Sequence, residues 1–315
     1  MIAGRHRALV RVLLSAALAT AAMACKPAVT PASEGPSSTT TSTAALAASD
    51  NGLRPWPSIR SWAYWLDSPS VDQLARTRYE LLVTDELSSS QIARLRAGAC
   101  RPRLVGYLSI GEAEDYRWYW QDAWRPGSPS WLLEENEDWD GNHRVEFWNP
   151  AWQRIVLTSL DRLVDLGYDG VYLDIVDAYE DQGHRAEMAA FVRAIASRAR
   201  SRSPLGADFG VFVQNAESLA AQPDVVGHLT GMAREETYVW ATDDPVPSSE
   251  RRSIEADLDR VLAGSQGHLV LTVDYASDAA LARDAESSSR ARGYLPYVTG
   301  VDLDALSTRP VAACS

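Results

Sequence analysis

Short apolar runs alternate with longer amphipathic stretches through most of this chain, and that alternation constrains its fold more than any other feature. The runs are rich in Val, Leu and Tyr and mostly unbroken, which is typical of parallel strands buried on both faces. We predict β-strands at residues 61–66, 81–84, 104–110, 170–175, 209–214, 228–233, 268–273 and 294–299. Helical patterns lie between most of them, and the clearest are at 150–166, 186–200 and 249–262.

Eight strands that alternate with helices over about 260 residues have the size of a (β/α)8, or TIM, barrel. We therefore predict an α/β fold in which residues 56–315 form one such barrel. A doubly wound sheet is the competing arrangement. The sequence lacks the glycine-rich phosphate-binding fingerprint that such a sheet carries after its first strand, and this favours the barrel.

The N-terminal residues have the features of an export signal. Three arginines precede an uncharged apolar run of 13 residues at 12–24, which is too short to span a bilayer. The run ends in Ala-Met-Ala-Cys at 22–25, which is similar to the bacterial lipobox. We predict a signal peptide at 1–25 with Cys25 as the lipidation site, followed by a flexible Ser/Thr/Pro/Ala linker at 26–55. The protein is then an exported cell-envelope lipoprotein, or an extracellular protein if cleavage occurs nearby instead.

Composition and charge exclude several classes of protein. Three cysteines are too few for a disulfide scaffold or a four-thiolate zinc site. The only lysine, Lys26, lies outside the predicted barrel, so the barrel has no lysine for Schiff-base catalysis. Residues 50–315 hold 26 of the 30 basic and 41 of the 42 acidic residues, a net charge of −15 that argues against a nucleic-acid binder. In an oxidising compartment, Cys100 and Cys314 are predicted to form a disulfide, and two free thiols are the alternative.

Acidic residues follow most of the predicted strands. In a (β/α)8 barrel the active site lies at the C-terminal ends of the strands, so these positions are candidates for function. A ring of converging carboxylates costs free energy unless pKa values shift or cations bind. The alternative is that each acid bonds to loop backbone. The strand ends carry Asp67, Asp85, Glu86, Glu112, Glu114, Asp174, Asp177, Asn215, Glu217, Glu235, Glu236 and Asp274.

Other catalytic chemistries find little support in the sequence. The five histidines form neither a His-x-His nor a His-Glu-x-x-His pair, and no Gly-x-Ser-x-Gly motif is present. We therefore expect no metal and no cofactor. Paired carboxylates remain, and these perform the chemistry of glycoside hydrolysis.

Seven of the 11 tryptophans fall between residues 118 and 152, in a long insertion after the third strand. Aromatic faces beside polar groups make platforms for sugar rings. The alternative, which we favour for most of them, is that they attach the insertion to the barrel.

Three segments resemble the signature blocks of a known family. Residues 106–117 read Gly-Tyr-Leu-Ser-Ile-Gly-Glu-Ala-Glu-Asp-Tyr-Arg, residues 167–180 read Gly-Tyr-Asp-Gly-Val-Tyr-Leu-Asp-Ile-Val-Asp-Ala-Tyr-Glu, and residues 231–238 read Gly-Met-Ala-Arg-Glu-Glu-Thr-Tyr. Over residues 57–300 the chain resembles glycoside hydrolase family 114, the endo-α-1,4-polygalactosaminidase-like barrels. The family more often has Glu-Asp-Leu-Phe at 235–238. The resemblance implies hydrolysis of α-linked galactosamine polymers by an Asp after the fourth strand and a Glu after the sixth, which correspond to Asp174 and Glu235.

The predicted mechanism uses Asp174 as nucleophile or base and Glu235 as general acid. The predicted partner is a polysaccharide, a cationic aminosugar polymer that an acidic cleft would attract. We expect no nucleic acid, and contact with a membrane only through the lipid anchor. The competing functions are a non-catalytic carbohydrate-binding barrel and a hydrolase of a neutral α-galactoside. Candidate substrate-binding residues are Tyr64, Asp85, Tyr107, Glu112, Asp177, Asn215, Glu236, Asp274 and Tyr297.

Overall fold

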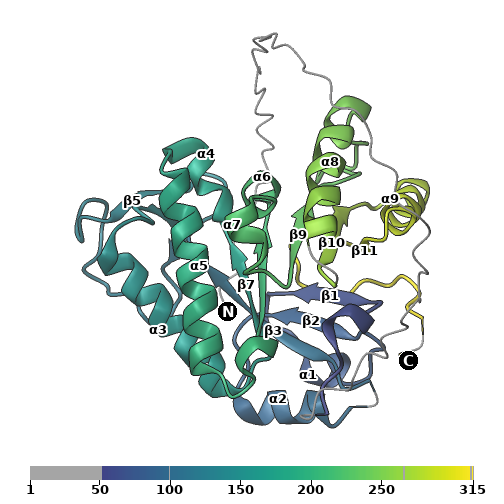
Figure 1. Ribbon diagram of the computed structural model, residues 1–315, viewed down its shortest axis with the longest axis horizontal. Helices are drawn as coiled ribbons and strands as arrows, with labels where there is room; N and C mark the ends of the chain where they lie inside the picture. Colours follow the sequence, from purple (N-terminus) through teal and green to yellow (C-terminus); the bar gives the residue numbers. More distant parts are fainter. Residues whose placement is uncertain (1–51, 99, 265–266, 313, 315) are drawn as a thin grey trace, which may run out of the picture.

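The computed structural model describes residues 52–98, 100–264, 267–312 and 314. The predicted signal peptide, the lipidation site Cys25 and residues 26–51 of the predicted linker lie outside them. Eight parallel strands form one sheet that curls into a nearly closed barrel, so the predicted (β/α)8 TIM barrel is confirmed (Figure 1). In sheet order the strands are β1 (Trp62–Trp65), β2 (Leu81–Thr84), β3 (Arg103–Ser109), β7 (Gly170–Asp174), β8 (Gly210–Gln214), β9 (Gly231–Glu235), β10 (Leu269–Tyr275) and β11 (Leu295–Thr299).

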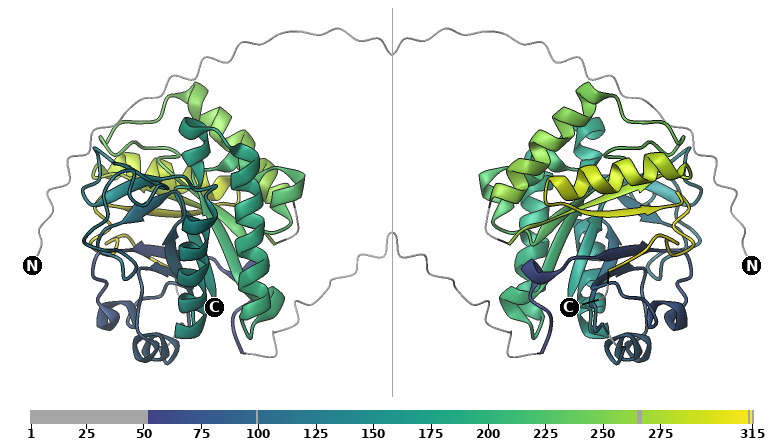
Figure 2. Two further views of the ribbon diagram at one scale, coloured as in Figure 1. Left: turned by 90° about the vertical axis from the view of Figure 1, so that its left-hand side faces the viewer. Right: turned by 90° about the vertical axis from the view of Figure 1, so that its right-hand side faces the viewer.

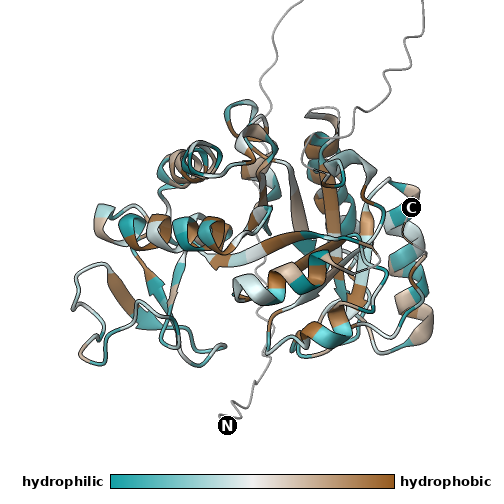
Figure 3. Ribbon diagram, turned by 90° about the horizontal axis from the view of Figure 1, so that it is seen from below, coloured by the Kyte–Doolittle hydropathy of each residue, from teal (hydrophilic) through white to brown (hydrophobic). Residues whose placement is uncertain are grey.

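Helices pack around the outside of the strands, and apolar residues are concentrated on the strands between them (Figures 2 and 3). No helix in the described part of the chain is long and apolar enough to cross a membrane. The α-helices are α1 (Val71–Leu74), α2 (Ser89–Arg96), α3 (Pro150–Leu166), α4 (Tyr179–Gln182), α5 (Arg185–Arg202), α6 (Glu217–Ala220), α7 (Pro223–Val226), α8 (Ser248–Gly264) and α9 (Ala279–Ala291). The short 3-10 helices are η1 (Trp56–Ser58), η2 (Val176–Ala178) and η3 (Gly206–Asp208).

Local sequence explains the ends of α3, whose bounds match the prediction. The side chain of Asn149 caps its first turn by accepting a hydrogen bond from Ala151 N at 3.0 Å, and Pro150 occupies the first helical position, where no N–H is needed. The helix ends at Gly167, which has φ 101°, a conformation that glycine adopts without a steric penalty.

The seam between β1 and β11 is closed by side chains and by the C-terminal segment. The indole of Trp62 donates to Leu295 O at 2.8 Å, and Leu66 N donates to Leu303 O at 3.1 Å. Further along this segment, Cys314 is bonded to Cys100 with 5.6 Å between their Cα atoms. The C-terminal segment is therefore held to the end of β1 and to the turn between α2 and β3.

The N-terminal end of the barrel is filled by Trp56 from η1. Its ring packs edge-on against Phe212 at 5.5 Å, and the guanidinium of Arg103 lies 4.4 Å from the ring centre. A Cβ atom on Gly210 would come within 2.5 Å of this indole, so β8 must begin with glycine. Trp56 therefore covers this end, and the opposite rim is where (β/α)8 enzymes place their active sites.

The insertion after β3 contains a small antiparallel sheet that the sequence analysis did not predict. Its strand order is β4 (Glu112–Glu114), β6 (Asn142–Val145) and β5 (Leu132–Glu135). Trp131 and Trp152 are buried and pack at 5.1 Å, which ties this sheet to α3. Trp118 and Trp139 are 50% and 41% exposed, so about half of each side chain faces solvent.

Candidate active site

Four neighbouring strands each end on a polar side chain. β7 ends at Asp174, β8 at Gln214, β9 at Glu235 and β10 at Tyr275. Glu235 receives hydrogen bonds from both neighbouring strands: Gln214 Nε2 donates to its Oε2 at 2.5 Å, and the Tyr275 hydroxyl donates to its Oε1. These side chains therefore converge on one place at the C-terminal rim, where (β/α)8 enzymes place their chemistry.

A second amide fixes Glu235 from the side. Asn215 Nδ2 donates to Glu235 Oε2 at 2.8 Å, while Asn215 Oδ1 accepts from Glu235 N at 3.0 Å and from Arg234 at 3.2 Å. Because two donors face the amide oxygen, the NH2 group must face the carboxylate. Arg234 is itself ion-paired with Glu217 at 3.4 Å. The orientation of Glu235 is thus set by a chain of polar contacts that reaches α6.

Asp174 is held by two donors. The Tyr107 hydroxyl donates to its Oδ2 at 2.7 Å, and Ile175 N donates to its Oδ1 at 2.8 Å. Burial raises the pKa of Asp174 well above its usual value, the negative charge of Glu235 raises it further, and the two hydrogen bonds oppose this shift. The site therefore retains a proton to a higher pH than an ordinary aspartate would.

Two tyrosines form the floor beneath these acids. The rings of Tyr64 and Tyr172 lie 5.1 Å apart inside the barrel, and Tyr64 donates to Gln214 Oε1 at 3.3 Å. Burial raises the pKa of both phenols, and the charges of Asp174 and Glu235 add to the shift in each. Tyr64 is linked to Glu235 through Gln214, and Tyr172 shares a face of β7 with Asp174, so the two acids lie on the same side of the touching rings. We call the interior end of the barrel that they share the chamber. The buried Tyr172 hydroxyl has no hydrogen-bond partner among the described residues.

The residue after each of three strand ends adopts a left-handed backbone conformation. Ile175, Asn215 and Glu236 have φ values of 54°, 55° and 51°. This conformation is rare for residues other than glycine and costs most for a β-branched one, so Ile175 is a true outlier. The sharp turn brings Ile175 N onto the carboxylate of Asp174. Strain of this kind concentrates where function requires a fixed geometry.

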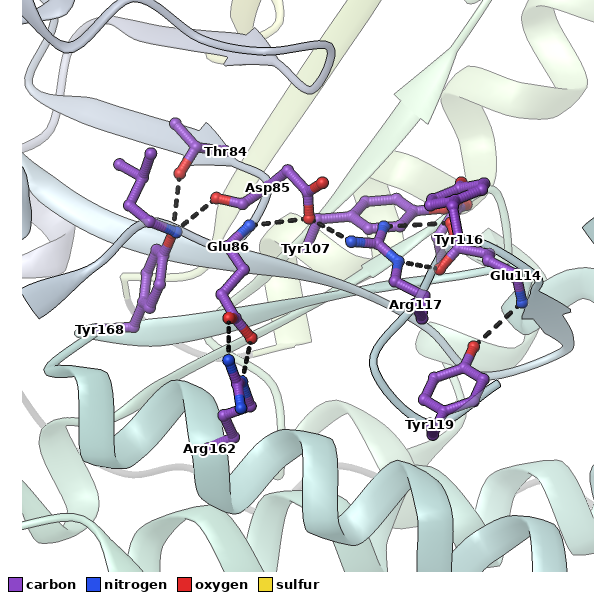
Figure 4. A network of polar contacts seen from close by, with 12 residues as sticks. Thr84, Asp85, Glu86, Tyr107, Glu114, Tyr116, Arg117, Tyr119, Arg162 and Tyr168 are labelled. Carbon is purple, nitrogen blue, oxygen red and sulfur yellow. Dashed lines mark hydrogen bonds and ion pairs between the residues drawn. The ribbon is translucent and has the colours of Figure 1, made fainter. Parts of the chain in front are cut away.

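Arg117 from the insertion supports the far side of Tyr107 (Figure 4). It donates to Glu114 at 2.6 Å and pairs with Asp85, which lies at the end of β2. Its guanidinium carbon lies 5.6 Å from the ring centre of Tyr107 and 5.0 Å from that of Tyr116. The predicted residue Asp85 thus acts through Arg117 on the tyrosine that contacts Asp174.

The structure places Asp177 beside the acid pair. It lies on η2, one turn after Asp174, and burial raises its pKa to about 7. The positive charge of Arg234 opposes that shift and the negative charge of Glu235 adds to it, so both groups are close to Asp177.

Two other predicted residues support loops. Glu236 accepts from Ala241 N at 2.6 Å and shapes the loop after β9. Glu112 is buried and accepts from Asn136 at 2.9 Å within the insertion.

Asp274 and Tyr297, both predicted to bind substrate, are buried and bond to backbone groups. Asp274 is 0% exposed, and its Oδ1 accepts from Tyr238 N at 2.6 Å and Val239 N at 2.9 Å. Tyr297 is 3% exposed and accepts from Ser307 N at 3.1 Å in the seam beside β1. Both side chains thus bond to backbone groups of neighbouring segments.

Three residues of the site were missed by the sequence analysis: Gln214, Tyr275 and Tyr172. Gln214 and Tyr275 each stand next to a residue that was chosen, Asn215 and Asp274. Tyr172 lies two positions before Asp174, and side chains two apart on a strand share a face. That spacing was the available signal.

The arrangement suits acid–base chemistry. Two carboxyl groups face one chamber, both are oriented by neutral donors, and a tyrosine hydroxyl contacts each of them. Such a pair can transfer a proton on one side of a bond and attack on the other. Nowhere in the described ranges do three or more His, Cys, Asp or Glu side chains gather as a metal site would require.

Comparison with known families and sequences gives a consistent match. The model of glycoside-hydrolase family GH114 matches residues 42–314. An uncharacterized protein of Deinococcus radiodurans is 41% identical over 236 residues, which cover 72% of this chain and 75% of that protein. An uncharacterized protein of Methanocaldococcus jannaschii is 32% identical over 276 residues, covering 78% of each chain.

Solved structures share the fold. The glycoside hydrolase domain of PelA from Pseudomonas aeruginosa has a TM-score of 0.61 at 20% identity, covering 79% of this chain and 97% of that domain. Aspergillus fumigatus Ega3, solved as a complex with galactosamine, has a TM-score of 0.60 at 21% identity, covering 81% of this chain and 96% of its own. At this identity the likeness concerns the fold.

Proposed function

We propose a substrate and a mechanism on one premise: the chain belongs to glycoside hydrolase family GH114. The reaction class is therefore hydrolysis of a glycosidic bond. The proposed substrate is a polysaccharide of α-linked galactosamine units, and Asp174 and Glu235 are the proposed reacting groups. The observation that carries the mechanism is that hydrogen bonds from neighbouring strands orient both acids at the same end of the barrel.

Two observations support an aminosugar substrate. Ega3, which shares the fold, was solved with galactosamine bound. Residues 50–315 of this chain hold 41 acidic and 26 basic residues, and an acidic surface attracts a polymer of protonated amines and raises its rate of encounter.

Glu235 is the proposed general acid. Its Oε2 faces two amide NH2 groups, from Gln214 and Asn215, and these can only donate. Its Oε1 faces the Tyr275 hydroxyl, which can donate or accept. The proton of a neutral Glu235 therefore belongs on Oε1. From there it passes to the glycosidic oxygen as the bond between that oxygen and the anomeric carbon breaks.

Asp174 is the proposed nucleophile or base. As the bond breaks, positive charge develops on the sugar, and an ionised Asp174 either bonds to the anomeric carbon or deprotonates the attacking water. Its raised pKa means that Asp174 of the free protein readily takes up a proton. A bound ammonium sugar adds positive charge nearby and so favours the ionised form of Asp174, which is the form that reacts.

Product analysis on a panel of aminosugar polymers tests the proposal. The intact protein should release oligosaccharides from a galactosamine polymer, and Asp174→Asn should bind the polymer without cutting it. High salt should weaken binding of this cationic substrate, whereas cleavage of a neutral α-galactoside would be nearly independent of salt. No cleavage of any aminosugar polymer would point to the non-catalytic carbohydrate-binding barrel instead.

A leaving-group series separates the roles of the two acids. Glu235→Gln should lose activity on the polymer but retain it on a galactosaminide with an activated phenol, whose departure needs no proton. Asp174→Asn should lose both. Glu236→Gln is the matched control, because Glu236 is adjacent in sequence yet binds Ala241 N. Equal loss on both substrates for Glu235→Gln would contradict the assignment.

We also propose that the protein is exported and attached to the cell envelope by lipid on Cys25, with residues 26–55 as a linker. The basis is the sequence pattern alone. The mass of the mature N-terminus distinguishes a lipidated Cys25 from simple cleavage and secretion.

A further inference from the structure

A hollow on the surface of the insertion and α3 is not used by the mechanism. It has a volume of about 470 Å³, within the range of small-molecule sites. Its aromatic lining is Trp118, Tyr119, Trp120 and Trp124, and the first half of α3 contributes Arg154 and its neighbours. We call it the α3 hollow.

The polar groups of the α3 hollow are available to a ligand. Within the described chain, the side chains of Gln121 and Arg154 make no hydrogen bond or ion pair. Trp118 is 50% exposed and touches Tyr119 edge-on at 5.8 Å. Ring faces beside an amide and a guanidinium supply the stacking surface and the donors that bind sugar hydroxyl and carbonyl groups.

The α3 hollow lies toward the same end of the barrel as the acid pair. α3 begins at Pro150, after the insertion that follows β3, so its first half lies near the C-terminal ends of the strands. Between the α3 hollow and Tyr107 lies a notch of about 30 Å³, roughly enough for one or two water molecules. Trp118 and Tyr119 line both, so the two hollows lie on either side of this residue pair.

The charge of the lining residues differs between the α3 hollow and the notch. The charged residues that line the notch are three acids and one base, Asp85, Glu86, Glu114 and Arg117. No carboxylate lines the α3 hollow, and its one charged lining residue is Arg154. An ammonium group would be repelled by Arg154. An N-acetyl group would offer a carbonyl to its guanidinium and a methyl to the tryptophans.

We infer that the α3 hollow is a second carbohydrate-binding site, which takes an uncharged, N-acetylated sugar unit of the polymer. The inference rests on the proposed function for the identity of that polymer. The chain would then hold deacetylated units at the acids and acetylated units at the α3 hollow, so the protein would favour a polymer that contains both.

Binding of short oligosaccharides tests the inference. The test uses full-length Asp174→Asn protein at high salt, with no other ligand present. Under these conditions we expect an N-acetylgalactosamine trisaccharide to bind more tightly than its deacetylated form. Trp118→Ala should weaken binding of the acetylated trisaccharide by about tenfold. Arg154→Glu should reduce the preference for the acetylated form by about tenfold, because the new charge attracts ammonium. Calorimetry measures each affinity.

The matched control is Arg283→Glu, since Arg283 is also exposed and forms no ion pair within the described residues, yet lies on α9 at the other side of the barrel (Figure 1). It should leave the preference unchanged. An unchanged preference in Arg154→Glu, or no binding of the acetylated trisaccharide, overturns the second site. Failure to cut any aminosugar polymer overturns the proposed function instead, whatever the trisaccharide does.

Discussion

Tyr107→Phe should shift the pH dependence of the reaction while leaving the barrel folded. The substitution removes one hydroxyl, which donates to Asp174 Oδ2 at 2.7 Å. A hydrogen bond to a charged group contributes about 1.5–3 kcal/mol, and each 1.36 kcal/mol corresponds to one pKa unit. The pKa of Asp174 is already raised by burial and by Glu235, and losing this donor should raise it further.

The sign of the effect follows from the proposed role of Asp174. If Asp174 reacts as a carboxylate, kcat/KM falls as pH drops below its pKa, so the acidic limb of the profile should move to higher pH. At a pH below the shifted limb, activity should fall by about 10- to 100-fold, and it should recover as the pH rises. The assay is kcat/KM across pH on one soluble galactosaminide.

Tyr168→Phe provides the control. Its hydroxyl is also buried and bonds to Thr84, Leu87 N and Asp85 O, outside the chamber. It should lower the free energy of unfolding without moving the acidic limb. A limb that stays in place in Tyr107→Phe, or moves to lower pH, would refute the proposed role of Tyr107 and with it the nucleophile or base assignment.

Three further outcomes are expected. Asn215→Asp replaces the donor to Glu235 with a second carboxylate and should lower kcat/KM about 10- to 100-fold, with partial recovery at low pH as the new carboxyl group is protonated. Burial raises the pKa of Asp274 to about 7, so the free energy of unfolding should fall by up to about 4 kcal/mol as the pH rises from about 4 to 7. Asp274→Asn should remove this pH dependence, as measured by urea unfolding at several pH values. Replacing Cys100 and Cys314 by serine opens a link across 214 residues and should lower the free energy of unfolding by about 5 kcal/mol, measured by urea denaturation.

The fold was predictable because the signal for each strand is local. All eight predicted apolar runs contain or overlap a strand of the barrel, and α3 begins at Pro150 and ends at Leu166 as expected. The sheet in the insertion was not predictable from periodicity. Its strands are three or four residues long, and β5 and β6 carry charged or polar residues among the apolar ones.

The sequence by itself determined which strand ends carry the chemistry, because an acid that directly follows a buried parallel strand must emerge at the functional rim. Tertiary structure alone decided which of two consecutive residues enters the chamber. Tyr275 does so and Asp274 does not, since alternate side chains on a strand point to opposite faces and a shift of one residue exchanges them. Only the closed barrel brings Arg234 to the amide of Asn215 and Tyr107 to Asp174, because these contacts join strands that are far apart in the sequence.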